Sequence, residues 1–226
     1  MNSDMASIAE NIHTLLKELP AHVRLIAVSK TKPVSDLQEA YNAGQRIFGE
    51  NYVQELTEKQ PLLPADIEWH FIGHLQSNKV KYIAPFVHCI HGVDSFKLLK
   101  EISKQAVKNN RIIQCLLQIH IAIEESKFGF SANELRAELQ NFNPSDYPGI
   151  VLSGLMGMAS FSHDETLIRT EFNNLKHLFD EIKSGSLTVL PSFTQLSMGM
   201  SSDWKIAVQE GSTMIRVGSS IFGVRN

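Results

Sequence analysis

Short apolar runs alternate along the chain with longer segments in which apolar positions recur at helical spacing. Each apolar run is typical of a buried strand, and each longer segment is typical of an amphipathic helix. The predicted strands lie near 23–29, 46–48, 68–72, 87–91, 112–121, 149–155, 193–197 and 214–217. The predicted helices are 33–44 with Ser35 as cap, one from about 51, one capped by Ser77, 95–108, one beginning at Ser131, 165–184 and 202–209.

Eight strand–helix units in 226 residues favour one particular α/β fold. Strict alternation implies parallel strands joined by crossover helices, and eight such units in roughly 200–250 residues match a single (β/α)8 TIM-type barrel. A doubly wound open sheet is the rival, although the glycine fingerprint of its dinucleotide-binding version is absent. No linker composition divides the chain, so we expect one domain over 1–226. We expect an additional helix over 1–20, capped by Ser3 or Asp4 and packed on the barrel.

Charge and cysteine content narrow the function classes. The net charge is −3 and the pI about 6.3, which does not favour a nucleic-acid-binding surface. No basic amphipathic segment and no long apolar segment indicates a membrane. Cys89 and Cys115 lie in apolar runs and are too few for a secreted disulfide framework. No signal peptide is recognisable, so we expect a cytoplasmic protein with both thiols reduced.

Lys30 stands just beyond the end of the first apolar run. In a TIM-type barrel the chemistry belongs to residues at the carboxyl ends of the strands. An amine in a partly dry barrel mouth, with Lys32 as a neighbouring cation, is a nucleophile near neutral pH that forms a Schiff base with a carbonyl. The alternative is that Lys30 simply extends from the strand end into water, as most lysines do.

The last apolar run carries two further candidates. Period-two alternation places Arg216 and Gly218 on the inward face, where an arginine needs an acidic side chain or a ligand atom as partner. Gly218 and Ser219 are typical either of an ordinary turn or of a phosphate cradle built from backbone N–H groups. Together with the amine, these features fit pyridoxal 5′-phosphate (PLP), with the aldehyde on Lys30 and the ring nitrogen near Arg216. The phosphate is then expected at Gly218 and Ser219.

Six sequence blocks carry a resemblance that covers most of the chain from about residue 24. They are LIAVSKTKP, FGENYVQE, EWHFIGHLQSNK, GLMGMA, LSMGMSSDW and STMIRVGSSIFG. In these blocks the chain closely resembles the pyridoxal-phosphate homeostasis protein family, which is similar to the barrel domain of alanine racemase and lacks the second, β-rich domain of that enzyme. The resemblance implies a PLP-binding barrel that carries or buffers the cofactor, a role without an established reaction.

The resemblance also implies the cofactor-binding residues. The cofactor lysine of the family corresponds to Lys30 in AVSKT, and the asparagine next to the ring corresponds to Asn51 in GEN. The arginine and glycine of the R-x-G block lie on the last predicted strand. GHLQSNK stands where GPLQSNK is also usual, and this difference touches neither the lysine nor the R-x-G block. The implied cofactor-binding residues are Lys30, Asn51, Ser197, Arg216, Gly218 and Ser219.

Arg216 also bears on turnover. PLP enzymes that form a full carbanion usually place an acidic group on the pyridine nitrogen, and an arginine has no proton to share there. A racemase also needs a second acid or base, which alanine racemase takes from a separate domain for which a chain ending at Asn226 has no room. We therefore expect PLP as an internal aldimine on Lys30 without efficient turnover, and no catalytic residue.

Two alternative functions stay open at this stage. A weak amino-acid racemase of the alanine racemase type would use a residue such as Tyr52, Tyr82 or Cys115, and a class I aldolase-like barrel would bind a sugar phosphate. Lys32 is a candidate secondary PLP site. The expected partners are PLP and, as acceptors, PLP-dependent apoenzymes, with no nucleic acid and no membrane.

No metal site is predicted from the histidines. His88 and His91 lie three apart in a strand-like run, which would point their rings to opposite faces. His70 and His74 flank a strand end and lack helical spacing, so the chain has no Cys/His set with the spacing of zinc ligands.

Overall fold

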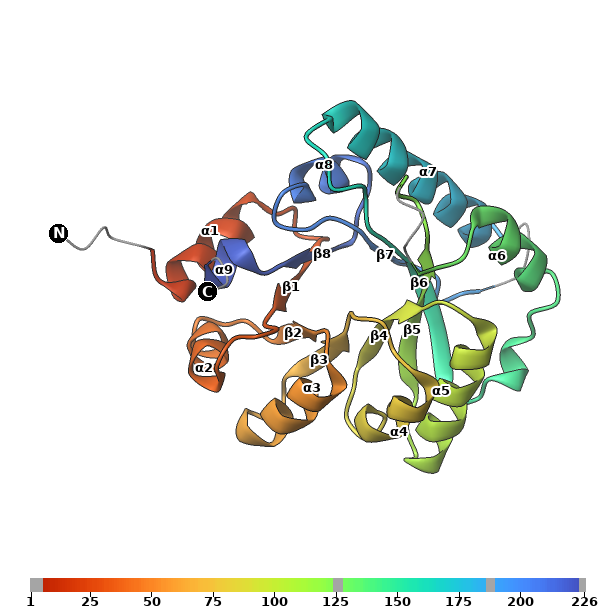
Figure 1. Cartoon of the computed structure of the whole chain (residues 1–226), viewed down its shortest axis with the longest axis horizontal. Coiled ribbons are helices and arrows are strands. Elements are labelled where there is room, and N and C mark those ends of the chain that lie inside the picture. The colour runs from red at the N-terminus through yellow and green to blue at the C-terminus, as the bar shows by residue number, and fades with distance from the viewer. Residues whose placement is uncertain (1–5, 124–127, 186–189, 224–226) are drawn as a thin grey trace.

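The computed structural model describes residues 6–123, 128–185 and 190–223, and over these residues the chain forms a closed parallel barrel surrounded by helices (Figure 1). The strands follow one another around the barrel in chain order, and β8 pairs with β1 to close it. The predicted TIM-type barrel is therefore confirmed, and the open sheet is wrong. The strands are β1 (Arg24–Val28), β2 (Ile47–Glu50), β3 (Glu68–Phe71), β4 (Cys89–Val93), β5 (Ile113–Ile119), β6 (Ile150–Gly157), β7 (Gln195–Ser197) and β8 (Met214–Val217).

Helices cover the outside of the barrel because each parallel strand needs a crossover connection to the next. The described helices are α1 (Ile8–Glu18), α2 (Val34–Asn42), α3 (Val53–Lys59), α4 (Val80–Ile83), α5 (Phe96–Lys108), α6 (Ala132–Leu139), α7 (Glu165–Lys183), α8 (Trp204–Gln209) and α9 (Ser219–Phe222). Short 3₁₀ turns, η1 (Gln60–Leu62), η2 (Ser77–Lys79) and η3 (Pro144–Asp146), lie between them. None of these described helices combines the length and apolar composition that crossing a bilayer requires.

Helix α1 packs against α2 and α9, so the two ends of the described chain lie together on one side of the barrel (Figure 1). The helix begins at a capping box in which the Ser7 hydroxyl accepts from the amide of Glu10, and the Glu10 carboxylate accepts from the amide of Ser7. Ile12 and Leu15 are its buried contacts. The predicted caps, Ser3 and Asp4, lie outside the described residues, and the cap is Ser7.

The predicted helix caps Ser35 and Ser77 differ from the structure. Helices α5 and α6, predicted to begin at Ser95 and Ser131, are capped by these serines, and each hydroxyl accepts from the backbone amide three residues on. Ser35 was wrong, since the cap of α2 is Pro33 and no side chain caps its amides. Ser77 was also wrong, because it belongs to the η2 turn and caps no α-helix. Ser95 and Ser131 stand directly before the first residue of their α-helices, whereas Ser35 and Ser77 do not.

The two sides of the strands differ in chemistry. Between strands and helices lies a continuous apolar core that includes Phe48, Phe71 and Phe172. Inside the barrel, the small apolar cluster of Cys89, Leu116 and Met156 lies among buried polar side chains. The buried polar residues that join across the interior are His70, His91, Ser197 and Arg216.

Candidate functional site

Strand pairing brings the predicted site residues to one end of the barrel. Val28 of β1 pairs with Gly49 of β2, and Ala27 pairs with Val217 of β8. Because the strands are parallel, the segments that follow β1, β2 and β8 emerge side by side at their carboxyl ends. The half-buried Lys30 therefore stands between the start of the β2–α3 connection and the turn that leads from β8 into α9.

The turn that carries Lys30 is conformationally unusual. Thr31 has φ +65°, the left-handed region that a residue with a branched Cβ rarely adopts. Its amide donates to Oε1 of Glu55 at 2.5 Å. On the other side of Lys30, Ser29 is fully buried, and its hydroxyl donates to Oε1 of Glu50 at 2.6 Å. Hydrogen bonds to two carboxylates thus hold both neighbours of Lys30, and they stabilise the turn.

A buried ion cluster supplies those two carboxylates. The Lys59 ammonium donates to Glu50 at 2.8 Å, to Glu55 at 2.6 Å and to the carbonyl of Ser29 at 2.8 Å. Glu50 is fully buried and Lys59 is 6% exposed. Burial raises the pKa of the Glu50 carboxyl, and the hydrogen bonds from Lys59 and Ser29 oppose that rise. The cluster therefore depends on all of its members, since a lone buried charge is costly.

Asn51 follows β2 and lines a cavity of about 700 Å³ between α3 and the η2–α4 segment. Its Oδ1 is buried and has no hydrogen-bond partner among the described residues. An acceptor without a donor in such a position is open to a ligand. Lys30 and Arg216 do not line this cavity, and Asn51 is the predicted cofactor residue among its lining residues.

Arg216 faces the barrel interior, as the alternation on β8 predicts, and is 4% exposed. Its Nη1 donates to the Ser197 hydroxyl at 2.6 Å, and its Nη2 donates to the carbonyl of Gly157 at 3.0 Å. Burial lowers the pKa of the guanidinium to about 10, and the charge of Asp203 opposes the shift. Arg216 thus remains a cation at neutral pH, held by two neutral oxygens.

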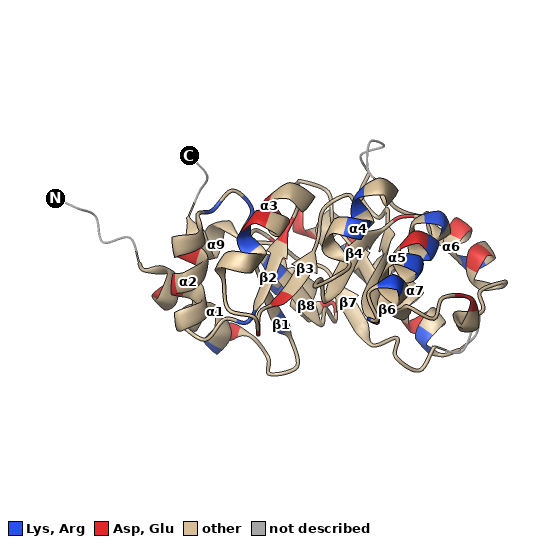
Figure 2. Ribbon diagram, turned by 90° about the horizontal axis from the view of Figure 1, so that it is seen from below, with Lys and Arg blue, Asp and Glu red and all other residues tan. Residues whose placement is uncertain are grey.

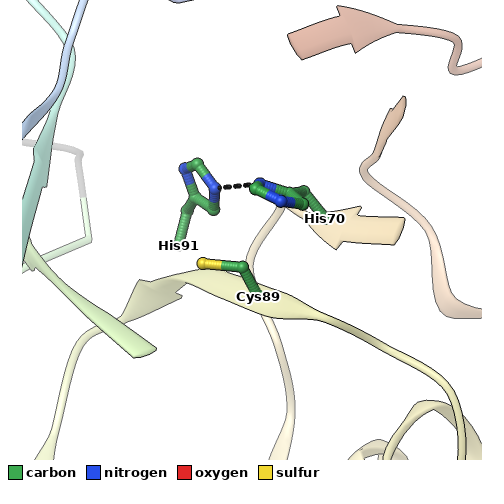
Figure 3. Close-up of side chains that lie close together, drawn as sticks. All are labelled: His70, Cys89 and His91. Atoms are coloured by element: carbon green, nitrogen blue, oxygen red, sulfur yellow. Dashed lines mark hydrogen bonds between the residues drawn. The ribbon is translucent and has the colours of Figure 1, made fainter. Parts of the chain in front are cut away.

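Ser197, predicted as a cofactor contact, is fully buried, and its hydroxyl contacts other side chains. Its hydroxyl accepts from Arg216 and lies 3.0 Å from Nδ1 of His91. Nε2 of His91 in turn lies 2.8 Å from Nδ1 of His70 (Figure 3). Burial lowers the pKa of both imidazoles well below the usual range, so both are neutral. Because arginine only donates, the serine oxygen accepts from Arg216, while the directions of the Ser197–His91 and His91–His70 hydrogen bonds depend on the imidazole tautomers. Nε2 of His70 has no partner among the described residues.

The histidine arrangement differs from the sequence expectation. His88 precedes β4, and its ring stacks on His70 at 5.7 Å between centroids, while His70 also contacts His91. The expectation that the rings of His88 and His91 diverge to opposite faces was therefore wrong. Ligand atoms of His70, Cys89 and His91 lie within 4.8 Å of one another (Figure 3). The direct His70–His91 hydrogen bond accounts for this contact, and burial raises the pKa of the Cys89 thiol, which opposes the thiolate that metal binding needs.

The β8–α9 turn offers backbone N–H groups to an anion. Among the described residues, the amides of Ser219 and Ser220 donate to no partner, and both residues are exposed. Gly218 packs so tightly on β1 that an added Cβ would lie 3.1 Å from the Val28 carbonyl oxygen. Lys32 donates to the carbonyl of Phe222 at 2.8 Å, which ties the Lys30 loop to the end of α9.

The sequence alone did not reveal two residues that support the site, Lys59 and His91. Lys59 lies four residues after Glu55 on a helix, a pattern that usually marks an exposed ion pair. Its burial could have been anticipated only from its spacing of three from the buried Leu56. His91 was considered only as a metal ligand, and its contact with Ser197 joins β4 to β7, which no local pattern reveals.

The fold and the site together define a barrel of the alanine racemase type. The family described as the alanine racemase N-terminal domain matches residues 3–226. Relatives named pyridoxal phosphate homeostasis protein include that of Pasteurella multocida, 38% identical over 100% of this chain and 98% of the relative. The human relative of that name is 40% identical over 93% of this chain and 80% of its own. The chain belongs to the pyridoxal phosphate homeostasis protein family.

Solved structures agree with this assignment. PipY of Synechococcus elongatus PCC7942, solved without PLP, matches with a TM-score of 0.89 and 39% identity over 96% of this chain and 100% of PipY. The structure of PipY with PLP bound matches with a TM-score of 0.86 and 38% identity over the same shares.

Proposed function

We propose that this chain binds PLP and acts in cofactor homeostasis as a carrier or buffer, with the cofactor held on Lys30. The observation that carries the proposal is the relative PipY, whose structure has PLP bound and which matches nearly all of this chain. In the proposed linkage, the Lys30 amine condenses with the aldehyde of PLP, and an imine and one water are formed.

The residues around Lys30 fit such a ligand. The phosphate would rest on the exposed amides of Ser219 and Ser220, where backbone N–H groups favour an anion. The ring would lie between the orphan Oδ1 of Asn51 and the Arg216 guanidinium, with Arg216 beside the ring nitrogen. Ser197 acts on the ligand through Arg216, because its own hydroxyl already joins Arg216 and His91.

We further propose that bound PLP is not turned over efficiently. PLP supplies an electron sink when its ring nitrogen is protonated, and Arg216 remains a cation that donates at this position. The two neutral oxygens that hold Arg216, on Ser197 and Gly157, supply no acid in its place. The chain's own residues thus bind and orient the cofactor and leave its ring a weak sink.

The first experiment is the visible spectrum of the protein with PLP, followed by borohydride reduction and peptide mapping. We expect an imine absorbance and a pyridoxyl mass on the Lys30 peptide, and loss of both in Lys30→Ala. Lys205→Ala is the matched control, since Lys205 is an exposed partner of Glu18. A pyridoxyl group on another lysine, with Lys32 the first candidate, would contradict the assignment of Lys30.

The second experiment separates a carrier from a weak amino-acid racemase. We expect no exchange of the α-proton when alanine or serine is incubated in deuterated water with the PLP-loaded protein. Exchange that disappears in Lys30→Ala would favour the racemase. A colourless protein that binds a sugar phosphate would favour an aldolase-like function instead.

The partners and location complete the proposal. PLP-dependent apoenzymes are the proposed acceptors of the cofactor, and transfer from the loaded protein to a purified apoenzyme is the direct test. We propose a cytoplasmic location, because Cys89 and Cys115 are both buried, unpaired thiols, as is usual in a reducing compartment.

A further inference from the structure

We propose that Lys59 is a positioning residue for Lys30, because its ammonium group joins Glu50 and Glu55 into a cluster that holds the residues on both sides of Lys30. The inference rests on the proposed function, in which Lys30 carries the cofactor. Its evidence, however, consists of contacts within this chain, and one of its tests needs no cofactor.

The contacts reach Lys30 from both directions along the chain. Before Lys30, the Lys59 ammonium bonds the carbonyl of Ser29 and shares Oε1 of Glu50 with the Ser29 hydroxyl, at 2.8, 2.8 and 2.6 Å. After Lys30, Lys59 bonds Oε1 of Glu55 at 2.6 Å, and the same oxygen accepts from the Thr31 amide. The buried Lys59 ammonium therefore contacts Ser29 directly and Thr31 through Glu55, which are the two neighbours of the proposed cofactor lysine.

The two carboxylates keep these positions only while a cation lies between them. Oε1 of Glu50 and Oε1 of Glu55 both lie within 2.8 Å of the same nitrogen, so without it two like charges would face each other. Glu50 is fully buried, its Oε2 has no hydrogen-bond partner among the described residues, and Lys59 is the cation that hydrogen-bonds its Oε1. Removal of the ammonium therefore frees Glu55 from the place where it holds Thr31.

The backbone at Thr31 makes this hold consequential. Its φ of +65° is unfavourable for threonine and persists when surrounding contacts impose it. If Glu55 releases the amide, Thr31 returns to an ordinary conformation, and the direction of the Lys30 side chain changes with it. Attack of an amine on an aldehyde requires close alignment, and a displacement of about 1 Å can slow such a reaction by about 100-fold.

The first test uses the protein without cofactor and measures hydrogen exchange at the Thr31 amide by NMR. We expect exchange in Lys59→Met to be about tenfold faster than in wild type, because the Glu55 acceptor is no longer fixed. Lys59→Arg, which keeps the cation, is expected to retain part of the protection. Lys205→Met, at an exposed ion pair, is the matched control and is expected to leave the Thr31 amide unchanged.

The second test measures the rate at which Lys30 acquires a reducible pyridoxyl group after PLP is added. We expect this rate to fall about tenfold or more in Lys59→Met and to recover partly in Lys59→Arg. Glu50→Gln/Lys59→Met removes both buried charges and keeps a carbonyl acceptor for the Ser29 hydroxyl, so it is the variant of choice if Lys59→Met alone does not fold. It is expected to remain slow, because Glu55 is still unrestrained.

Two results would overturn the role of Lys59. One is wild-type exchange at Thr31 together with wild-type labelling of Lys30 in a folded Lys59→Met. The other is full recovery of both in Glu50→Gln/Lys59→Met, which would show that the single variant suffers only from an uncompensated charge. If wild-type protein itself acquires no pyridoxyl group at Lys30, the proposed function fails, while the Thr31 exchange rate still decides whether Lys59 positions the turn.

Discussion

The two sides of the barrel mouth are supported in opposite ways. The lysine side, formed by Lys30 and the cluster of Glu50, Glu55 and Lys59, is held by buried charges (Figure 2 shows the charges gathered on α3). The arginine side consists of Ser197, Arg216, Gly218 and the buried histidines. Its cation, Arg216, is held by neutral oxygens, and neutral imidazoles and close backbone packing support the rest of this side.

This difference indicates to which perturbation each side is most sensitive. A cluster of charges is sensitive to loss of any one charge, because the remaining charges lose their compensation. A chain of neutral hydrogen bonds is sensitive to protonation and to changes of shape. The two sides should therefore fail under different conditions, although both belong to one site.

Loss of the central charge on the lysine side should have the largest effect. Lys59→Met leaves the fully buried Glu50 uncompensated, so we expect the free energy of unfolding to fall by about 3–5 kcal/mol. Adding Glu50→Gln should recover most of that loss. Guanidinium denaturation of the three proteins measures both values, and equal stability of the single and double variants would contradict a charge-based support.

Acid should weaken the arginine side. Burial holds the pKa of His70 and His91 well below the ordinary value near 6.5, so below pH 6.5 the unfolded chain binds protons that the folded chain does not. The stability that these neutral imidazoles contribute is present above pH 6.5 and is lost as the pH falls. The expected loss is about 1.4 kcal/mol per pH unit for each histidine.

Denaturation between pH 7.5 and 5.5 measures this slope, and the difference between wild type and a His70→Gln/His91→Gln variant isolates the pair. His177→Gln, at an exposed position of α7, is the matched control for the loss of a histidine at the surface. An unchanged slope in the double variant would show that the buried pair does not titrate as proposed.

A change of shape at the β8–α9 turn should have a smaller effect. In Gly218→Ala, the added Cβ would lie 3.1 Å from the Val28 carbonyl oxygen and 3.3 Å from its Cβ. We expect a loss of about 1–3 kcal/mol in stability and weaker PLP binding. Gly44→Ala is the matched control: its φ of +100° strains the backbone far from the site, so it should lower stability and leave PLP affinity unchanged.

The smallest expected effect belongs to Lys32, which links the two sides. Lys32→Met removes the hydrogen bond to the Phe222 carbonyl, and we expect a loss of about 1 kcal/mol in stability. PLP affinity should fall by about fivefold, which calorimetry can measure. After reduction, the pyridoxyl group should remain on Lys30, and its appearance on Lys32 in wild type would favour a secondary cofactor site over a structural link.

Apolar periodicity was sufficient to predict the barrel, because strands buried on both faces are almost continuous apolar runs. The exceptions are informative. β2 was placed at 46–48 and lies at Ile47–Glu50, because Gly49 and the buried Glu50 do not look like strand residues. Glu50 is compatible with the strand only because Lys59 lies against it, and a partner on a later helix is invisible to a local pattern.

The candidate site likewise contains residues whose positions local patterns predict and residues whose contacts they do not. Lys30, Arg216 and Gly218 follow from strand ends and alternation, since these positions are set by the backbone. Ser197 was assigned to the cofactor by resemblance, and that assignment stays a prediction; in the structure its hydroxyl contacts Arg216 and His91. Which of two nearby groups a short side chain contacts depends on tertiary packing, and the sequence does not encode that locally.

The pairing of Ile26 with Arg216 has a consequence for biosynthesis. The strand that precedes Lys30 leaves the ribosome well before its neighbour β8, because all the other strands lie between them along the chain. Until β8 has been made, the growing chain therefore has Lys30 without the β8–α9 turn beside it. If Lys30 holds the cofactor as proposed, loading should begin only after β8 has left the ribosome and paired with β1 to close the barrel.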